Sequence, residues 1–254
     1  MWRSNQAVDP RSILITGASS GIGAALACAY AGPGSHLALG ARDADRLAAV
    51  AERCRAAGAV VTGRRVDVTE REAMAAWIAE TDDARPLDLV VANAGISGPE
   101  TPPRRIVEVN LLGVLNTVEP ILPRFLARRR GHLALMSSLA AFRATPTTPA
   151  YGASKAAVLA YGDALRPRLA AQGVRVTVIC PGFVRTPMTA GNPFAMPLIM
   201  TPERAALIIR AGLERGRPRI VFPRTLYLVT RLAAALPHAL VDAILGRQPP
   251  KENL

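Results

Sequence analysis

Short apolar runs alternate with longer stretches of helix-like pattern along almost the whole chain. Seven runs have the length and composition of strands, at residues 12–16, 35–41, 59–66, 87–92, 132–138, 174–180 and 219–222. Helical patterns lie between and after them, at residues 21–31, 43–57, 69–81, 103–128, 150–171 and from 201 onward, with an amphipathic segment after residue 222. Strands that alternate with helices in this way are typical of βαβ units with parallel strands.

The alternation runs from one end to the other without an internal repeat or a low-complexity linker. It predicts a single doubly wound α/β domain over residues 1–254, with a mostly parallel seven-stranded sheet flanked by helices. We expect a cofactor half at about 10–137, a catalytic and substrate half at about 138–222, and a C-terminal helical tail at about 223–254. Thr69 and Thr201 stand where helix N-caps are expected.

A glycine-rich turn, TGASSGIG over residues 16–23, joins the first strand to the first helix. Glycines permit a tight turn and let the backbone approach a pyrophosphate, which rests on the helix N-terminus. The spacing GxxxGxG departs from the GxGxxG fingerprint, but it occurs at the first strand-to-helix crossing, where a dinucleotide site is expected. The residues expected to contact the cofactor are Gly17, Ser19, Ser20, Gly21, Ile22 and Gly23.

The ends of the next three strands carry further candidates for cofactor contacts. Arg42 follows the second strand, where an NAD site would place an acidic residue, so the guanidinium favours the 2′-phosphate of NADP(H), with NAD(H) still possible. Asp43 could be a helix cap or a competing ribose ligand. We expect contacts with the adenine and the cofactor backbone at Asp67, Val68, Asn93, Ala94 and Gly95.

The net charge of +12 is dispersed along the chain, and aromatic residues make up only 4% of it. We therefore interpret the charge as an arginine-rich surface and predict no nucleic-acid partner. Only Lys155 and Lys251 are lysines. Because arginine cannot lose its proton or act as a compact point charge, Lys155 is a candidate for chemistry.

The N-terminal residues lack the apolar region of a secretory signal, and the three cysteines lie far apart in apolar or helical stretches. These features favour free thiols in a reducing compartment, so we predict a cytoplasmic protein. His132 and His238 stand without neighbouring ligands in the sequence, and we predict no metal site.

Tyr151 and Lys155 stand four residues apart at the start of a predicted helix and so share one face. A nearby ammonium favours the phenolate and lowers the pKa of a tyrosine toward the range useful for acid–base catalysis. Ser138, thirteen residues upstream, ends the fifth predicted strand and can offer its hydroxyl to a substrate oxygen.

From Ile13 to about Ile220 the sequence strongly resembles the short-chain dehydrogenase/reductase family. The glycine turn, the Asn-Ala-Gly strand end, the interval from Ser to Tyr, the YxxxK box and the segment PGFVRT at 181–186 occur in the family's order. The resemblance implies a Rossmann-like fold and an NADP-preferring oxidoreductase that acts on a CH–OH group.

The resemblance also implies roles for individual residues. Tyr151 would be the acid/base, Lys155 would hold the ribose hydroxyls and lower the pKa of Tyr151, and Ser138 would position the carbonyl. Asn110 would interrupt its helix and support a water chain to the lysine, or only stabilise a kink. Later cofactor contacts are expected at Pro181, Gly182, Val184 and Thr186.

Substrate and partners are less constrained, because the segments 95–110 and 186–202 are shorter than is usual in the family. The apolar stretch 192–200 is either a hydrophobic pocket wall, favouring a small apolar alcohol or ketone, or ordinary packing. The tail could make weak peripheral contact with a membrane, or pack as a dimer or core helix. The resemblance implies a homodimer or homotetramer. A non-catalytic dinucleotide sensor on the same fold is the main alternative.

Overall fold

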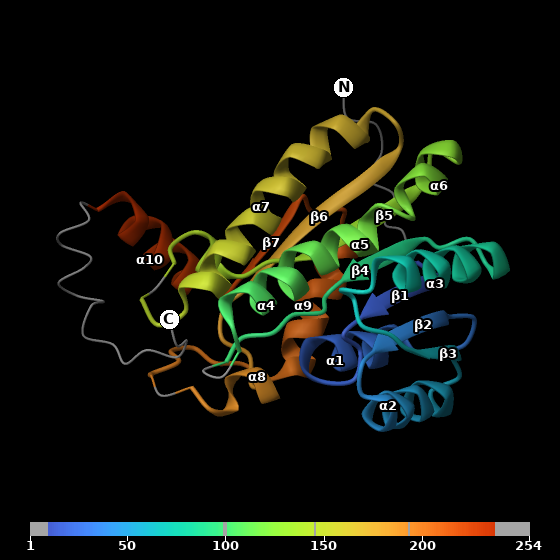
Figure 1. The fold of residues 1–254 in the computed structure, drawn as a ribbon, viewed down its shortest axis with the longest axis horizontal. Helices are drawn as coiled ribbons and strands as arrows, with labels where there is room; N and C mark the ends of the chain where they lie inside the picture. Colours follow the sequence, from blue (N-terminus) through green and yellow to red (C-terminus); the bar gives the residue numbers. More distant parts are fainter. Residues whose placement is uncertain (1–9, 99–100, 145, 193, 237–254) are drawn as a thin grey trace.

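The computed structural model describes residues 10–98, 101–144, 146–192 and 194–236. Their strands form one seven-stranded parallel sheet in the order β3-β2-β1-β4-β5-β6-β7 (Figure 1). The strands are β1 (Ser12–Thr16), β2 (His36–Ala41), β3 (Val60–Arg65), β4 (Leu89–Ala92), β5 (Gly131–Met136), β6 (Val174–Pro181) and β7 (Arg219–Phe222). The predicted doubly wound α/β fold is confirmed.

Ten α-helices accompany the strands in the described residues. They are α1 (Gly21–Tyr30), α2 (Ala44–Ala56), α3 (Arg71–Ala84), α4 (Pro103–Val107), α5 (Gly113–Val118), α6 (Leu122–Ala127), α7 (Pro149–Ala170), α8 (Pro187–Ala190), α9 (Pro202–Glu214) and α10 (Arg224–Ala235). A π-helical turn, η1 (Glu108–Leu112), joins α4 to α5, and a 3-10 turn, η2 (Leu139–Ala141), follows β5.

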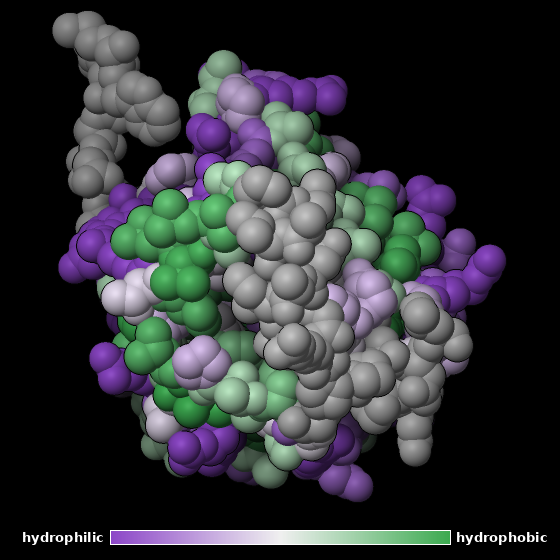
Figure 2. All heavy atoms as spheres, turned by 90° about the vertical axis from the view of Figure 1, so that its left-hand side faces the viewer, coloured by the Kyte–Doolittle hydropathy of each residue, from purple (hydrophilic) through white to green (hydrophobic). Residues whose placement is uncertain are grey.

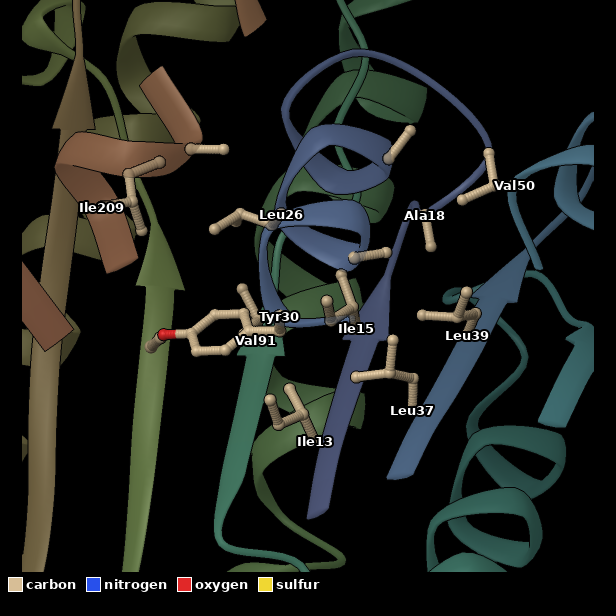
Figure 3. Close-up of a cluster of buried hydrophobic side chains, with 14 of the residues drawn as sticks. Ile13, Ile15, Ala18, Leu26, Tyr30, Leu37, Leu39, Val50, Val91 and Ile209 are labelled. Atoms are coloured by element: carbon tan, nitrogen blue, oxygen red, sulfur yellow. The ribbon is translucent and has the colours of Figure 1, made fainter. Parts of the chain in front are cut away.

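Strand β1 shows why apolar and polar residues do not alternate along the predicted strands. Ile13 and Ile15 pack into one hydrophobic core and Leu14 into the other, and all three are fully buried. The first core lies under α1, α2 and α9 (Figure 3), and the second under α3, α5, α6 and α7. Each such side chain stabilises the fold by about 1.5–3 kcal/mol, so the central residues of a strand covered on both faces are apolar at successive positions.

The predicted helix over 103–128 is wrong as a single element, because the chain there is divided into α4, η1, α5 and α6. Thr69 is also wrong as a helix cap. Its backbone N–H and hydroxyl both donate to the Asp67 carboxylate, at 3.0 and 2.9 Å, and α3 begins two residues later. Thr201 does cap α9, where its hydroxyl accepts from the Arg204 N–H.

Among the described residues, the stretch Pro103–Ala127 is the one that is long and apolar enough to cross a membrane by length and composition. Half of its most apolar window is buried inside the protein. There Val114, Val118 and Phe125 join the hydrophobic core against the sheet. Core packing therefore accounts for the apolar composition of this stretch.

The strand order reverses between β1 and its neighbour β4. Helix α1 follows β1 and covers one face of the sheet, whereas the connection after β4 crosses to the other face. The two connections diverge at the carboxyl ends of these strands. Open α/β sheets bind ligands in the crevice that such a divergence leaves.

Candidate active site

A cleft of about 690 Å³ lies along the carboxyl ends of the central strands. It is lined by every residue that the sequence analysis proposed as a cofactor contact, together with Ser138, Tyr151 and Lys155. Those cofactor candidates are Gly17, Ser19, Ser20, Gly21, Ile22, Gly23, Arg42, Asp67, Val68, Asn93, Ala94, Gly95, Tyr151, Lys155, Pro181, Gly182, Val184 and Thr186. Asn110 alone of the proposed site residues does not line the cleft.

The glycine turn leaves no room for side chains at its closest approaches. Gly17 has φ 66°, and a Cβ there would lie 2.8 Å from the Ala94 Cα. A Cβ on Gly23 would lie 2.3 Å from the Gly17 carbonyl oxygen. The turn thus opens α1 with its N-terminal N–H groups at the cleft and no acidic residue in the first turn. Such a cradle fits an anionic pyrophosphate.

Thr16 ties the glycine turn to β4. Its hydroxyl accepts from the backbone N–H groups of Asn93 and Ala94, at 3.0 and 3.1 Å. The Asn93 side-chain amide in turn donates to the carbonyls of Thr16 and Gly17, at 2.9 and 3.2 Å. The Asn93 amide is therefore engaged in holding the turn, and the contribution of Thr16 was missed from the sequence.

Asp43 acts as the N-cap of α2. Its carboxylate accepts from the Arg46 backbone at 2.9 Å and from the Arg46 Nε at 2.5 Å, and these bonds hold the Asp43 pKa below its usual range. Arg42 lies beside it at the cleft edge and also lines an adjoining hollow with Arg64 and Arg65. This end of the cleft is therefore rich in guanidinium groups.

Asp67, at the end of β3, is held by Arg105 of α4 at 2.7 Å as well as by Thr69. Burial raises the pKa of Asp67, but the hydrogen bonds from Thr69 and the charges of Arg105 and Arg42 outweigh it, so the net pKa is lowered. The carboxylate stays ionised and fixed at the cleft wall. Arg105 was missed because it lies 38 residues from Asp67 in the sequence.

Lys155 is almost completely buried on α7, at 2% exposure. Its Nζ donates to the Met136 carbonyl at 2.9 Å and lies 5.8 Å from the centroid of the Tyr151 ring. Burial lowers the Lys155 pKa to about 8. A Cβ on Gly95 would lie 3.3 Å from this Nζ, so the backbone after β4 passes directly over the ammonium group.

Ser138 stands two residues beyond β5 and caps η2, which differs from the expectation that it ends the strand. Its hydroxyl accepts from the Ala140 N–H at 3.1 Å and makes a long contact of 3.4 Å with the Pro181 carbonyl. The neighbouring Ser137 hydroxyl donates to the Lys155 carbonyl at 2.8 Å. The end of β5 is thereby fastened to α7.

Asn110 lies fully buried in the π-helical turn, behind the cleft wall. Its side-chain oxygen accepts from the Ile96 N–H at 2.8 Å, and its amide donates to the Ile96 carbonyl at 3.0 Å and to the Ser154 hydroxyl at 3.1 Å. The helix is interrupted at the residue where the family resemblance implied an interruption. Asn110 connects the loop after β4 to the helix that carries Tyr151 and Lys155.

The segment after β6 closes the cleft near the glycine turn. A Cβ on Gly21 would lie 2.9 Å from the Thr186 side chain. Thr189 holds this segment by donating to the Val184 carbonyl at 2.7 Å and accepting from the Thr186 N–H at 2.9 Å.

None of the described residues of 192–200 lines the cleft, contrary to one of the two expectations for that stretch. Met200 instead forms a β-bridge with Val184, and Phe194 contacts the Phe183 ring, so the stretch folds back on the loop after β6. The nearby Pro187 and Met188 line the cleft in its place.

Ser97, after β4, also lines the cleft, and its buried hydroxyl has no hydrogen-bond partner in the described structure.

Over residues 10–98, 101–144, 146–192 and 194–236, no group of three His, Cys, Asp or Glu side chains could hold a metal ion. His132 is buried on β5 with its Nε2 2.9 Å from the Thr177 hydroxyl. Burial and the nearby Arg175 lower its pKa to about 3. His238 lies outside the described residues.

The short chain dehydrogenase family model matches residues 11–194. An uncharacterized oxidoreductase of Myxococcus xanthus is 40% identical over 93% of this chain and 97% of its own. The 1-deoxy-11-beta-hydroxypentalenate dehydrogenase of Streptomyces exfoliatus is 38% identical over 72% of this chain and 71% of its own.

Solved structures agree with this likeness. A short-chain dehydrogenase/reductase of Burkholderia phymatum in complex with NAD has a TM-score of 0.81, with 25% identity over 98% of this chain and 99% of that one. A short-chain dehydrogenase of Sphingobium yanoikuyae in complex with NADPH has a TM-score of 0.77, with 27% identity over 90% and 97%. Both nicotinamide cofactors thus occur among similar structures.

Proposed function

The chain belongs to the short-chain dehydrogenase family, and from this premise we propose that it interconverts a ketone and a secondary alcohol with NADP(H). The observation that carries the proposal is the single cleft that holds the glycine turn together with Ser138, Tyr151 and Lys155. The glycine positions whose Cβ atoms would clash, and the unpartnered Ser97 hydroxyl, suit a bound dinucleotide. The cofactor would supply or accept the hydride.

Tyr151 is the proposed acid/base. In the direction of reduction its hydroxyl donates a proton to the oxygen of the substrate as negative charge develops there, and in oxidation the proton returns. The Ser138 hydroxyl, at the cleft wall and fixed by the Ala140 N–H, would donate a hydrogen bond to the same oxygen. The two hydroxyls together orient the carbonyl.

Lys155 is proposed to act through its charge. A pKa of about 8 leaves the ammonium protonated at neutral pH, and its position near the Tyr151 ring favours the phenolate. We propose that the same group binds the ribose hydroxyls of the cofactor. Asn110 is proposed as a positioning residue, because its hydrogen bonds join the Ile96 loop to Ser154.

We propose NADP(H) as the preferred cofactor. The cleft edge at β2 presents Arg42, and Asp43 is occupied by the α2 N-terminus and Arg46. Guanidinium groups bind a phosphate in charge-assisted hydrogen bonds, whereas an NAD site favours a free carboxylate there.

The proposed substrate is a small apolar alcohol or ketone, supported by Ile96, Pro187 and Met188 in the cleft lining. The relative from Streptomyces exfoliatus, named for a hydroxypentalenate, points in the same direction. We further propose that the chain works as one domain in the cytoplasm, and that it forms the homodimer or homotetramer that the family resemblance implies.

The decisive experiment measures consumption of NADPH and of NADH across a library of aliphatic, cyclic and polar carbonyl compounds. We expect turnover of apolar ketones with NADPH, and about a thousandfold slower turnover in the Tyr151→Phe variant. Calorimetry on the same samples measures cofactor binding separately. Tight nucleotide binding without oxidation of NADPH by any compound would support the dinucleotide sensor instead.

A further inference from the structure

Helix α10 turns an apolar side away from the protein. Leu228, Val229, Leu232 and Leu236 are 58, 61, 70 and 44% exposed. The spacing of Leu228, Val229 and Leu232 places them on one side of the helix, and Leu236 is its C-cap residue; we call these four residues the outer stripe. Figure 2 shows a hydrophobic patch on this side of the molecule, the side on which α10 lies in Figure 1.

The other side of α10 accounts for its attachment to the protein. Leu226 and Tyr227 pack against a small hydrophobic cluster that includes Leu139 and Cys180. The Tyr227 ring meets the Phe142 ring edge-on at 5.0 Å. These contacts position α10 without the outer stripe, although a surface helix ordinarily turns its polar side to water.

The charges on α10 are all of one sign. Arg224 and Arg231 are exposed, and residues 223–236 contain no Asp or Glu. The Arg231 guanidinium lies 5.8 Å above the Phe142 ring, at the edge of the outer stripe. An apolar stripe bordered by arginines and free of carboxylates has the character of a helix that lies in the surface of an anionic membrane.

We propose that α10 docks the protein onto an anionic lipid surface, with the outer stripe at the acyl boundary and the arginines at the headgroups. A second copy of the chain fits this side less well. Twofold contact through the stripe would bring Arg224 and Arg231 close to the same arginines of the partner, with no carboxylate on α10 to pair with them.

Docking in this way would bring one wall of the cleft close to the lipid. Gly182 lines the cleft, and a Cβ there would lie 3.1 Å from the Leu226 side chain on the inner side of α10. An apolar ketone dissolved in the membrane would then have a short route to the site. This last consequence rests on the proposed function, whereas lipid docking itself does not.

The test is co-sedimentation of the full chain with vesicles, without substrate. Vesicles of equal parts phosphatidylglycerol and phosphatidylcholine are compared with vesicles of phosphatidylcholine alone. We expect binding to the anionic vesicles, weakened by salt, and a loss of about tenfold or more in the L228S/V229S/L232S variant. The control is L207S, which replaces a 63% exposed leucine on α9 and should bind like the wild type.

A second pair of variants tests the charge. Arg224→Gln should weaken binding severalfold, about the effect of one basic residue near such a surface, while Arg53→Gln on α2 should not. Turnover of a water-soluble ketone should remain unchanged in all four variants, which separates this proposal from the proposed function. Binding by the triple variant equal to wild type would overturn the proposal.

Size-exclusion chromatography and thermal melting test two other partners for the outer stripe, a second copy of the chain and another part of the same chain. A triple variant that changes oligomeric state, with wild-type vesicle binding, would assign the stripe to a second copy. A large fall in Tm without any vesicle effect would assign it to packing within the chain. Either result would replace the lipid surface as the partner of α10.

Discussion

Around Gly17 and Gly23 the cleft is shaped by backbone atoms, whereas around Lys155 it is shaped by buried side chains. The glycine end gains its form from close approaches of the main chain and from guanidinium groups at the surface. The lysine end depends on the buried Lys155 ammonium, which donates a hydrogen bond to the Met136 carbonyl. The comparison teaches that changes at the first end should act on binding, and changes at the second on rate and on pH dependence.

The largest effect is expected from Tyr151→Phe. Removing the proposed proton donor should lower kcat by about a thousandfold, within the range that a positioned acid/base supplies. The Kd for NADPH should stay within about twofold, since the ring and its packing remain. Steady-state kinetics and calorimetry check both quantities. A fall in cofactor affinity as large as the fall in kcat would show that the lysine end of the cleft acts on binding as well as on rate.

Lys155→Met tests the buried charge through stability. The folded protein loses this proton near pH 8, whereas the unfolded chain keeps it to about pH 10.5. Between these values the unfolded state binds more protons, so the wild-type free energy of unfolding should rise with pH across the window, by about 3 kcal/mol in all. The variant lacks this contribution.

Denaturant titrations of wild type and Lys155→Met at several pH values between 7 and 10.5 measure this effect. As the pH rises, the free energy of unfolding of the wild type should increase relative to that of the variant. Activity of the variant should be lost at every pH. Parallel stability curves would show that burial does not perturb Lys155.

At the opposite end, Gly23→Ala should act mainly on binding. The added Cβ would meet the Gly17 carbonyl, a backbone atom that cannot move without opening the turn. We expect the Kd for NADPH to rise about thirtyfold, equivalent to about 2 kcal/mol. Gly32→Ala is the matched control, because a Cβ there meets nothing within 4 Å. Equal affinity of the two variants would contradict the backbone-built cradle.

The smallest effect is expected from Arg42→Ala. The loss of one exposed phosphate contact should lower kcat/KM for NADPH about tenfold and leave kcat/KM for NADH within about twofold. Arg53→Ala, another exposed arginine without a place in the cleft, should change neither. Equal loss with both cofactors would remove the argument for NADP(H).

The parts of the fold that depend on nearby residues in the sequence were predicted well. Strand β1 was predicted with its observed bounds because its side chains are buried on both faces. The candidate site residues other than Asn110 came together in one cleft, most of them because they follow parallel strands, whose carboxyl ends share an edge. Their proposed roles stay predictions.

What the sequence did not reveal depends on contacts between distant residues. The family resemblance implied the break in the helix at Asn110, but not the hydrogen bonds to Ile96 and Ser154, 14 and 44 residues away, that hold it. Thr69 is a residue type that often caps helices, but its hydroxyl instead donates a hydrogen bond to the Asp67 carboxylate. Arg105 and Thr16 carry no motif of their own and gain their place only through the folded chain.

The π-helical turn also sets how the rest of its segment meets the sheet. Gly113, the first residue after the turn, packs against Val68, and a Cβ on Gly113 would lie 2.6 Å from the valine side chain. The Asn116 side-chain amide donates to the Val68 carbonyl at 2.9 Å. Each residue of an α-helix advances its side chains by about 100°. Removing a single residue from the turn would therefore rotate the whole downstream face away from its partners. Insertions and deletions here should be far less tolerated than substitutions. The length of this short stretch therefore sets the rotation of the helix that follows it.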